Sequence, residues 1–318
     1  MQRSILYIFI IFAGICFSAC SKAADGDVGK QLSKAAEPTV PAVKDSKSAG
    51  TKEKEKTGTE ENTANTPVIE EAGYSEYFDG INGCAVFWNS NTNRYKMYNE
   101  EACEKRSSPC SSFKIVSALM GLESGVIDSP DSTMDYDGTV YPDDSWNKNL
   151  GLKEAFQESC IWYFRKVIDK VGPEKVQEYL NNLEYGNCDI SEWNGSGINP
   201  LPDLNGFWLE SSLKISPKEQ VEVLTRIFDG ESEFSEENIA ILKEIMLVQQ
   251  DEKISVYGKT GTGKNTATGN SDNAWFVGMF ENQKERYCFA VRLTDENRRD
   301  VNGVKAKEIE LNIISGIN

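Results

Sequence analysis

The spacing of hydrophobic and polar residues changes several times along the chain, and each change predicts an element. Two apolar runs, Gly83–Asn89 and Tyr95–Tyr98, flank the polar residues Ser90–Asn93, a pattern typical of a β-hairpin. Further on, apolar residues recur at helical spacing through a long middle region and again near the end. One helix is expected to start at Ser111. The others are expected over Leu150–Val171, Pro173–Leu183, Ser216–Phe228, Ser235–Met246 and Gly303–Ile314.

Three strand-like runs follow the middle helices: Ile254–Gly261, Asn273–Phe280 and Arg286–Leu293. Because strands from both ends enclose a helical stretch, we expect an α/β fold of the α+β type. Its strands should form one central antiparallel sheet, with flanking terminal helices and a helical lobe beside it. The cleft between sheet and lobe is the default position for a site.

The N-terminus has the pattern of an export signal. Arg3 precedes an apolar run, Ile5–Phe17, which is too short for a comfortable transmembrane helix. This predicts a signal peptide over residues 1–19. The next stretch, Phe17-Ser18-Ala19-Cys20, resembles a bacterial lipobox, which implies lipidation of Cys20. Phe17 is unusual at its position, so ordinary secretion stays open. We expect an exported lipoprotein, anchored to the membrane through Cys20 and facing the periplasm or the cell exterior.

Residues 20–72 contain no aromatic side chain and are rich in Lys, Glu, Ala, Thr, Ser and Pro. Such a segment buries too little apolar surface to offset its ordering entropy, so a disordered linker is predicted. Residues 73–318 remain for the folded domain, enough for one large domain or two closely packed lobes. The whole chain carries a net charge of −16 with no basic cluster, which argues against nucleic-acid binding.

The chain contains no histidine. This excludes Ser-His-Asp and Cys-His catalysis and every His-ligated metal centre, and we expect no metal site. A serine enzyme built from this chain must use a lysine, a carboxylate or a modified side chain as its base.

One serine lies where a lysine can activate it. Ser111 is expected in the first turn of a helix, and Lys114 three residues later shares its face. Apolar neighbours such as Phe113 should lower the pKa of Lys114, so that it acts as a base toward Ser111. Such a spacing also arises by chance, and a serine before an apolar helix is often only an N-cap. Whether Ser111 is a nucleophile or only an N-cap therefore depends on suitable side chains further along the sequence.

Three downstream stretches supply suitable side chains. Ser159-Cys160-Ile161 offers a second hydroxyl that can relay a proton. Lys259-Thr260-Gly261-Thr262-Gly263 offers a cation, hydroxyls and exposed backbone N–H groups for a carboxylate and an oxyanion. Phe207-Trp208-Leu209-Glu210 offers an indole N–H donor, although Trp208 in an apolar context also suits simple core packing.

A nucleotide-binding alternative is weak. Gly258–Lys264 fits the body of a phosphate-binding loop, but Asn265 stands where a magnesium-binding hydroxyl is required. The residues that follow predict a loop and a strand, whereas such a loop needs a helix.

Taken in order, the motifs resemble those of class D (oxacillinase-type) serine β-lactamases, over roughly residues 74–316. The resemblance rests on Ser111-Ser112-Phe113-Lys114, Ser159-Cys160-Ile161, Tyr185-Gly186-Asn187, Phe207–Glu210 and Lys259-Thr260-Gly261. It implies the penicillin-binding/serine β-lactamase fold and hydrolysis of β-lactam antibiotics through an acyl-enzyme on Ser111.

The resemblance also implies roles for the other residues. Lys114 would react with carbon dioxide or bicarbonate to give N6-carboxylysine, the general base for deacylation, and no other cofactor is expected. Trp208 would donate its indole N–H to that group, while Ile161 would keep the pocket apolar. Ser159 would shuttle a proton. Lys259, Thr260, Gly261 and Thr262 would bind the substrate, with the Ser111 and Thr262 backbone N–H groups holding the oxyanion.

Two other functions share these motifs. The sensor domains of penicillin receptors are acylated without turnover, but they accompany membrane helices and an effector and carry a polar residue where this chain has Ile161. Penicillin-binding transpeptidases share Ser-x-x-Lys and Lys-Thr-Gly, but usually have Ser-x-Asn in the middle and leave Trp208 unexplained. We therefore expect hydrolysis, with acylation alone as the alternative.

Two features depart from the family pattern or go beyond it. Many class D enzymes grip the substrate carboxylate with an arginine where this chain has Asn302. Two alternatives stay open: Arg298 or Arg299 takes its place, or Lys259 and the hydroxyls of Thr260 and Thr262 suffice. Six cysteines also lie in the domain, which permits disulfides in 15 full pairings. We expect Cys110 and Cys160 to serve as small core residues. The six are Cys84, Cys103, Cys110, Cys160, Cys188 and Cys288.

Overall fold

The computed structural model describes residues 66–263, 271–295, 298 and 300–317. The chain divides into two units, Met1–Thr59 and Glu60–Asn318, and the description below concerns the second. The predicted signal peptide at 1–19 and the predicted lipid-modified Cys20 lie outside the described residues. No helix in the described part of the chain has the length and apolar character that a membrane crossing requires.

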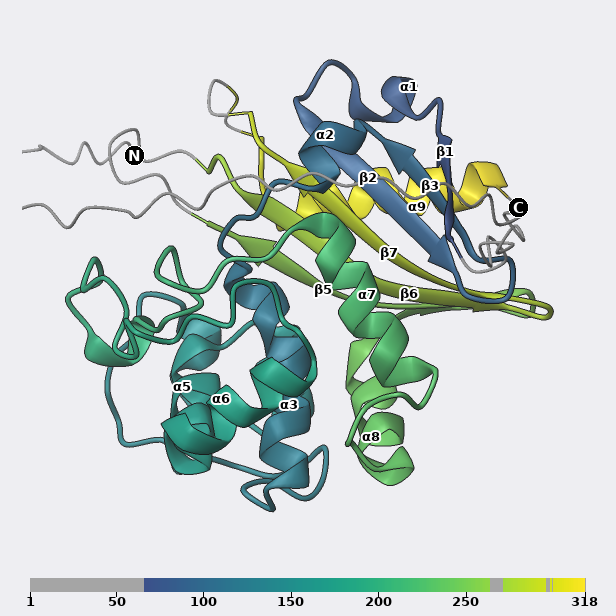
Figure 1. Ribbon diagram of the computed structural model, residues 1–318. Coiled ribbons are helices and arrows are strands. Elements are labelled where there is room, and N and C mark those ends of the chain that lie inside the picture. The colour runs from purple at the N-terminus through teal and green to yellow at the C-terminus, as the bar shows by residue number, and fades with distance from the viewer. Residues whose placement is uncertain (1–65, 264–270, 296–297, 299, 318) are drawn as a thin grey trace, which may run out of the picture. The chain divides into compact units, whose positions relative to one another are not determined.

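A seven-stranded sheet forms the centre of this unit, in the order β1-β3-β2-β7-β6-β5-β4 (Figure 1). Its strands are β1 (Val68–Glu71), β2 (Gly83–Asn89), β3 (Arg94–Tyr98), β4 (Leu247–Gln250), β5 (Ile254–Thr262), β6 (Ala274–Asn282) and β7 (Arg286–Leu293). The predicted hairpin is present as β2–β3, and β7 pairs with β2, joining strands from both ends of the chain. The predicted α+β fold with a central sheet is therefore confirmed.

One strand corrects two predictions. β1 lies within residues 20–72, the stretch predicted as a linker, and it pairs in parallel with β3 although a wholly antiparallel sheet was expected. The apolar pair Val68-Ile69 was too short to read as a strand. Both side chains stay largely exposed, so β1 is held mainly by backbone hydrogen bonds at the sheet edge.

The two faces of the sheet carry different helices. The helices are α1 (Ser75–Phe78), α2 (Glu100–Cys103), α3 (Lys114–Glu123), α4 (Leu152–Gln157), α5 (Ile161–Val171), α6 (Pro173–Asn182), α7 (Pro217–Phe228), α8 (Glu236–Met246) and α9 (Gly303–Ile317), with short 3₁₀ turns η2 (Cys110–Phe113), η3 (Asp144–Trp146) and η4 (Pro202–Leu204). Buried side chains of α1 and α9 pack on one face, and those of α3, α5, α7 and α8 on the other.

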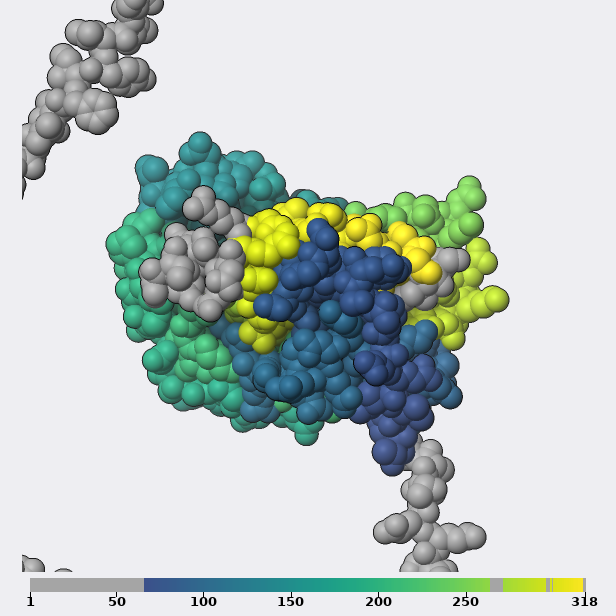
Figure 2. Space-filling model, turned by 90° about the horizontal axis from the view of Figure 1, so that it is seen from above, coloured from purple at the N-terminus to yellow at the C-terminus, as the bar shows by residue number. Residues whose placement is uncertain are grey.

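Alternation along β6 separates the two cores, because successive side chains of a strand point to opposite faces. Phe276 packs in the α9 core, and its neighbour Val277 packs in the core of the helical lobe. Figure 2 shows the blue N-terminal segment and the yellow C-terminal segment side by side, consistent with the contact between α1 and α9.

The sequence rules for helix starts hold well in the lobe. Ser216 accepts a hydrogen bond from the Glu219 backbone N–H, and the Glu219 carboxylate accepts one from the Ser216 N–H, so the predicted capping box opens α7. The predicted helix over Leu150–Val171 is instead two helices, α4 and α5. Ser159 lies between them with φ +57°, a left-handed conformation that cannot continue a right-handed helix.

Candidate active site

The Ser111 turn lies against the sheet, where η2 runs into α3. Within this turn the Lys114 ammonium donates a hydrogen bond to the Ser111 hydroxyl over 2.8 Å. Ser111 is partly exposed, so a small molecule can reach it, whereas Lys114 is 1 % exposed. A reachable hydroxyl is thus bonded to a buried amine, the arrangement that a lysine-activated nucleophile needs.

The surroundings of Lys114 disfavour its positive charge. The Phe164 ring centroid lies 5.6 Å from its nitrogen. Burial lowers the pKa of Lys114 from an ordinary 10.5 to about 7, an effect that the nearby sulfurs of Cys160 and Cys110 oppose. Burial therefore makes a neutral Lys114 accessible near pH 7, and a neutral amine can accept the hydroxyl proton of Ser111.

Trp208 packs in the core and also offers an indole N–H donor, the two roles that its sequence context allowed. Its side chain is 1 % exposed and stacks on Phe113, with ring centroids 5.5 Å apart. Its Nε1–H, however, has no hydrogen-bond partner among the described residues. A buried donor left unpaired costs free energy comparable to a lost hydrogen bond, so the indole is suited to an acceptor that arrives later.

The Trp208 segment is tied to the Ser111 turn through the backbone. The Trp208 carbonyl accepts hydrogen bonds from the Cys110 N–H at 3.0 Å and from the Ser108 hydroxyl at 2.8 Å. The Ser108 hydroxyl in turn accepts a hydrogen bond from the Glu210 N–H at 2.8 Å. Two segments far apart in the sequence are therefore fixed in one register beside the nucleophile.

β5 passes close to the same turn because Gly261 has no side chain. A Cβ atom at Gly261 would lie 3.0 Å from the Pro109 carbonyl oxygen and 3.1 Å from the Ser112 nitrogen. A larger residue would push the strand away from Ser111. Thr262, the last residue of the strand, accepts a hydrogen bond on its hydroxyl from the Gly303 N–H at 2.9 Å. This bond fixes the C-terminal end of β5 to the first residue of α9.

Lys259 is the second buried lysine of the site. Only 4 % of it is exposed, and its nitrogen donates to the Thr260 carbonyl at 3.1 Å and the Thr260 hydroxyl at 3.2 Å. Burial holds the pKa of Lys259 well below its usual range, and the positive charges of Lys114 and Lys307 lower it further. Lys259 and Lys114 therefore lie close enough for their positive charges to repel each other. An anion bound between them would offset this repulsion and raise the pKa of both lysines.

The middle motif lies at the turn between α4 and α5. Ser159 is partly exposed in that turn, and the next residue, Cys160, interacts electrostatically with Lys114. Ile161 begins α5 and lines a cavity of about 180 Å³ together with Cys110, Leu209 and Thr262. The structure thus gathers all three motifs around Ser111, while the roles assigned to their side chains stay predictions.

A buried polar cluster behind the nucleophile was not foreseen. Cys110 does not act only as a small core residue, because its thiol donates a hydrogen bond to a Glu210 carboxylate oxygen at 3.0 Å. The Asn273 amide donates to the same oxygen at 3.1 Å and to the Ser108 carbonyl at 2.9 Å. Asn273 also accepts from the Arg292 guanidinium at 3.0 Å. These residues are far apart in the sequence, so only the folded structure reveals the cluster.

The structure gives little support to an arginine at the substrate carboxylate. Arg298 donates hydrogen bonds to both carboxylate oxygens of Asp300, at 3.0 and 2.8 Å, and to the Asp79 carbonyl at 3.2 Å. The other candidate, Arg299, lies outside the described residues. Lys307, which the sequence interpretation missed, is the cation that α9 brings toward Lys259. Its position in the first turns of the predicted final helix is the sequence feature that could have identified Lys307 as a candidate.

Comparison with known proteins agrees with this geometry. Residues 54–315 match the family model described as the penicillin binding protein transpeptidase domain. Regulatory protein BlaR1 of Bacillus licheniformis is 36% identical over 248 residues, which cover 77% of this chain and only 39% of that protein. The chain thus spans about two fifths of the length of that relative.

Two solved structures show the same fold over almost their whole length. The C-terminal domain of the Bacillus licheniformis BlaR penicillin-receptor is 35% identical with a TM-score of 0.71, covering 79% of this chain and 97% of that one. FUS-1 (OXA-85), a class D β-lactamase from Fusobacterium nucleatum subsp. polymorphum, is 32% identical with a TM-score of 0.68, covering 77% and 97%. The chain therefore belongs to the penicillin-binding protein transpeptidase family and has the fold that class D β-lactamases and the BlaR receptor domain share.

Proposed function

We propose that this protein binds β-lactam antibiotics and hydrolyses them through an acyl-enzyme on Ser111. The observation that carries the proposal is the 2.8 Å hydrogen bond between Ser111 and a buried lysine whose pKa is lowered to about 7. Near neutral pH, Lys114 accepts the Ser111 proton while the oxygen attacks the β-lactam carbonyl. The lactam C–N bond breaks as the bond from Ser111 to the carbonyl carbon forms, which gives an acyl-enzyme that carries the opened ring.

The neighbouring residues have roles that follow from their positions. The backbone N–H groups of Ser111 and Thr262 stabilise the oxyanion, and Gly261 allows the strand to approach closely enough. Ser159 relays the proton to the leaving nitrogen. Lys259 and Thr260 bind the substrate carboxylate, whose negative charge restores the proton affinity that burial removes from Lys259. Substrate binding and protonation of Lys259 are therefore coupled.

Deacylation requires a base that can activate water. A carboxylate formed on the Lys114 nitrogen from carbon dioxide would supply that base. The residues fit this group on two counts: the lowered pKa of Lys114 makes a neutral amine available near pH 7, as reaction with carbon dioxide requires, and the Trp208 N–H lacks a partner among the residues described. Ile161, an apolar residue that lines the cavity together with Cys110, would limit the water that enters there.

Acylation without turnover is the second candidate function, because a BlaR regulatory protein and a BlaR receptor domain are 36% and 35% identical to this chain, compared with 32% for the class D enzyme FUS-1. The apolar Ile161 and the unpaired Trp208 N–H favour hydrolysis. We also propose that the domain acts outside the cytoplasm, anchored through a lipid on Cys20. The mass of the mature N-terminal peptide from native membranes would test the anchor.

Time-resolved intact mass and absorbance, recorded with a chromogenic cephalosporin with and without bicarbonate, test the function. Steady turnover that rises with bicarbonate, with a transient adduct on Ser111, is the expected result. A stoichiometric adduct that persists for hours would support the receptor-like function. The absence of both adduct and turnover would contradict β-lactam chemistry altogether.

A further inference from the structure

Two fully buried thiols lie together where β2 meets α2, away from the proposed chemistry. Cys84 is in β2 and Cys103 is the last residue of α2, and both are 0 % exposed. Both side chains belong to the core on the helical-lobe side of the sheet. All six cysteines in the described part of the chain are free thiols, so this pair is available for reaction.

The backbone brings the two residues together in two steps. In the β2–β3 hairpin, Ala85 is paired with Tyr98, and the next residue, Asn99, donates from its side chain to the Gly83 carbonyl at 3.0 Å. Asn99 is the N-cap of α2, and its carbonyl accepts a hydrogen bond from the Cys103 N–H at 3.1 Å. Cys103 therefore lies one helical turn from a residue that is fixed to the neighbour of Cys84.

The sulfur of Cys103 points onto the strand that carries Cys84. It lies 3.5 Å from the Ala85 carbonyl oxygen and 3.6 Å from the Tyr98 carbonyl oxygen. The Cys84 side chain is also the main cause that, with burial, raises the pKa of Cys103 above its usual range, as expected of two neighbouring thiols. Across the ladder, Arg292 is the partner of Cys84 and interacts electrostatically with it.

We propose that Cys84 and Cys103 are a cross-linking site, forming a disulfide between β2 and α2 when the chain folds under oxidising conditions. Each thiol loses a proton, the two sulfurs form a bond, and two electrons reduce the disulfide of an oxidant such as oxidised glutathione or an exported dithiol oxidase to two thiols. Because both thiols are buried in the folded protein, the bond forms during folding, before the pair is enclosed.

The disulfide would restrict the motion of the segment that leads to the Ser111 turn. It closes a loop that contains β3 and α2, which removes conformational freedom from the unfolded chain. The segment after Cys103 leads to Ser108 and Cys110, which are fixed to Trp208 by hydrogen bonds. A disulfide would thus anchor the start of a segment whose far end is already held. The proposal concerns stability and does not depend on the hydrolytic function.

The test uses the full chain, unfolded in guanidinium with a reductant and refolded either in glutathione redox buffer or in dithiothreitol. Free thiols are alkylated under denaturing conditions, and non-reduced peptides are mapped by mass spectrometry. We expect a Cys84–Cys103 cross-linked peptide as the main product of oxidative refolding. The oxidised protein should also have a melting midpoint about 5–10 °C higher than the reduced protein.

Single variants locate the effect. C103S should lose both the cross-linked peptide and the difference in melting midpoint, whereas C188S, at a partly buried cysteine outside the pair, should keep both. The map of the wild-type protein decides the matter even if C103S does not fold. Complete alkylation of Cys84 and Cys103 after oxidative refolding, or a predominant bond from either to a different cysteine, would overturn the proposal.

Discussion

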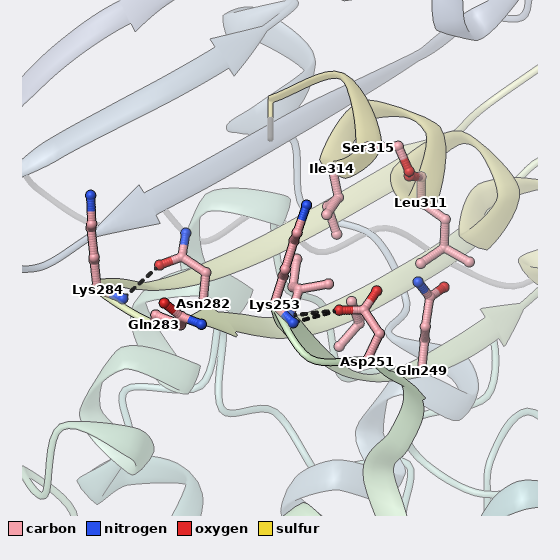
Figure 3. Close-up of a pocket in the computed structure, with 11 residues that line it drawn as sticks. Gln249, Asp251, Lys253, Asn282, Gln283, Lys284, Leu311, Ile314 and Ser315 are labelled. Carbon is pink, nitrogen blue, oxygen red and sulfur yellow. Dashed lines mark hydrogen bonds between the residues drawn. The ribbon is translucent and has the colours of Figure 1, made fainter.

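The two ends of β5 carry lysines in opposite environments. Lys253, just before the strand, is exposed beside a hollow of about 510 Å³ that α9 also lines (Figure 3). The polar groups there serve to close the turn, since the Asp251 carboxylate accepts hydrogen bonds from the backbone N–H groups of Lys253 at 2.7 Å and Ile254 at 3.0 Å. Lys259, toward the other end, is buried near Lys114.

The comparison shows that the volume of a hollow does not mark the reactive site. The cavity that Lys259 lines is smaller, about 260 Å³, yet the pKa of this lysine is held well below its usual range. Desolvation is what converts a lysine from a solvated cation into a base or an anion-binding group. Substitutions at the two ends of β5 should therefore have very different effects on β-lactam chemistry.

The largest effect is expected at the nucleophile. S111A should abolish acylation, because no other hydroxyl is bonded to Lys114 among the described side chains. Intact mass after incubation with a penicillin is the measurement, and no adduct should appear. K253A, at the exposed end of β5, is the control and should react like the wild type. An adduct that persists on S111A would place the nucleophile elsewhere.

The next largest effect is expected at Lys114. K114M should reduce steady turnover by about 10³-fold or more, because the base of the reaction is lost. In the wild type, the rate of acylation should fall about tenfold per pH unit below pH 7, where Lys114 becomes protonated. Stopped-flow acylation rates between pH 5 and pH 9 measure this. A rate independent of pH across 7 would contradict Lys114 as the base.

Stability gives an independent measure of the same burial. The native pKa of Lys114 is lower than its unfolded value, so the unfolded chain binds more protons between about pH 7 and 10.5, and stability rises with pH there. In buffer free of carbon dioxide, K114M should be more stable than the wild type by a few kcal/mol at pH 6.5, and by less at pH 9.5. K253M should change urea stability by less than about 0.5 kcal/mol. If K114M were more stable than the wild type by the same free energy at both pH values, a lowered pKa of Lys114 in the native state would be contradicted.

A smaller effect is expected from W208F, which keeps a ring against Phe113 and removes the N–H. Acylation should remain, while deacylation slows by about 10²-fold, since one donor to the proposed carboxylate is lost. The lifetime of the acyl-enzyme by mass spectrometry is the measurement, and high bicarbonate should shorten it. W193F, at a partly exposed tryptophan, is the control. Wild-type lifetimes in W208F at all bicarbonate levels would exclude this role.

Local patterns explain which parts of the fold could be predicted. The capping box at Ser216 and the β2–β3 hairpin depend on neighbours in the sequence, and both were predicted correctly. β1 and the break at Ser159 could not be predicted, because their positions are stabilised by pairing with β3 and by the packing of two helices. The same division holds for the site. Ser111 and Lys114 share one helical turn, whereas the contact between Cys110 and Glu210 requires tertiary structure.

The smallest predicted effect concerns that tertiary contact. E210A removes the nearer acceptor of the Cys110 thiol and leaves the Ser108 carbonyl at 3.6 Å, while Asn273 keeps its bonds to Ser108 and Arg292. We expect a loss of about 1–2 kcal/mol in the free energy of unfolding and a several-fold slower acylation, because the turn that holds Ser111 becomes less fixed. E210Q retains an acceptor oxygen and should recover most of the acylation rate.

A double-mutant cycle separates positioning from general destabilisation. If Glu210 acts through Cys110, then C110A should slow acylation by a similar factor, and the double variant C110A/E210A should be little worse than either alone. K253A again reports the exposed end of β5, where neither rate nor stability should change. Additive effects of C110A and E210A would mean that the carboxylate supports the site by a route other than the thiol. The contrast between the two ends of β5 would then rest on the lysines alone.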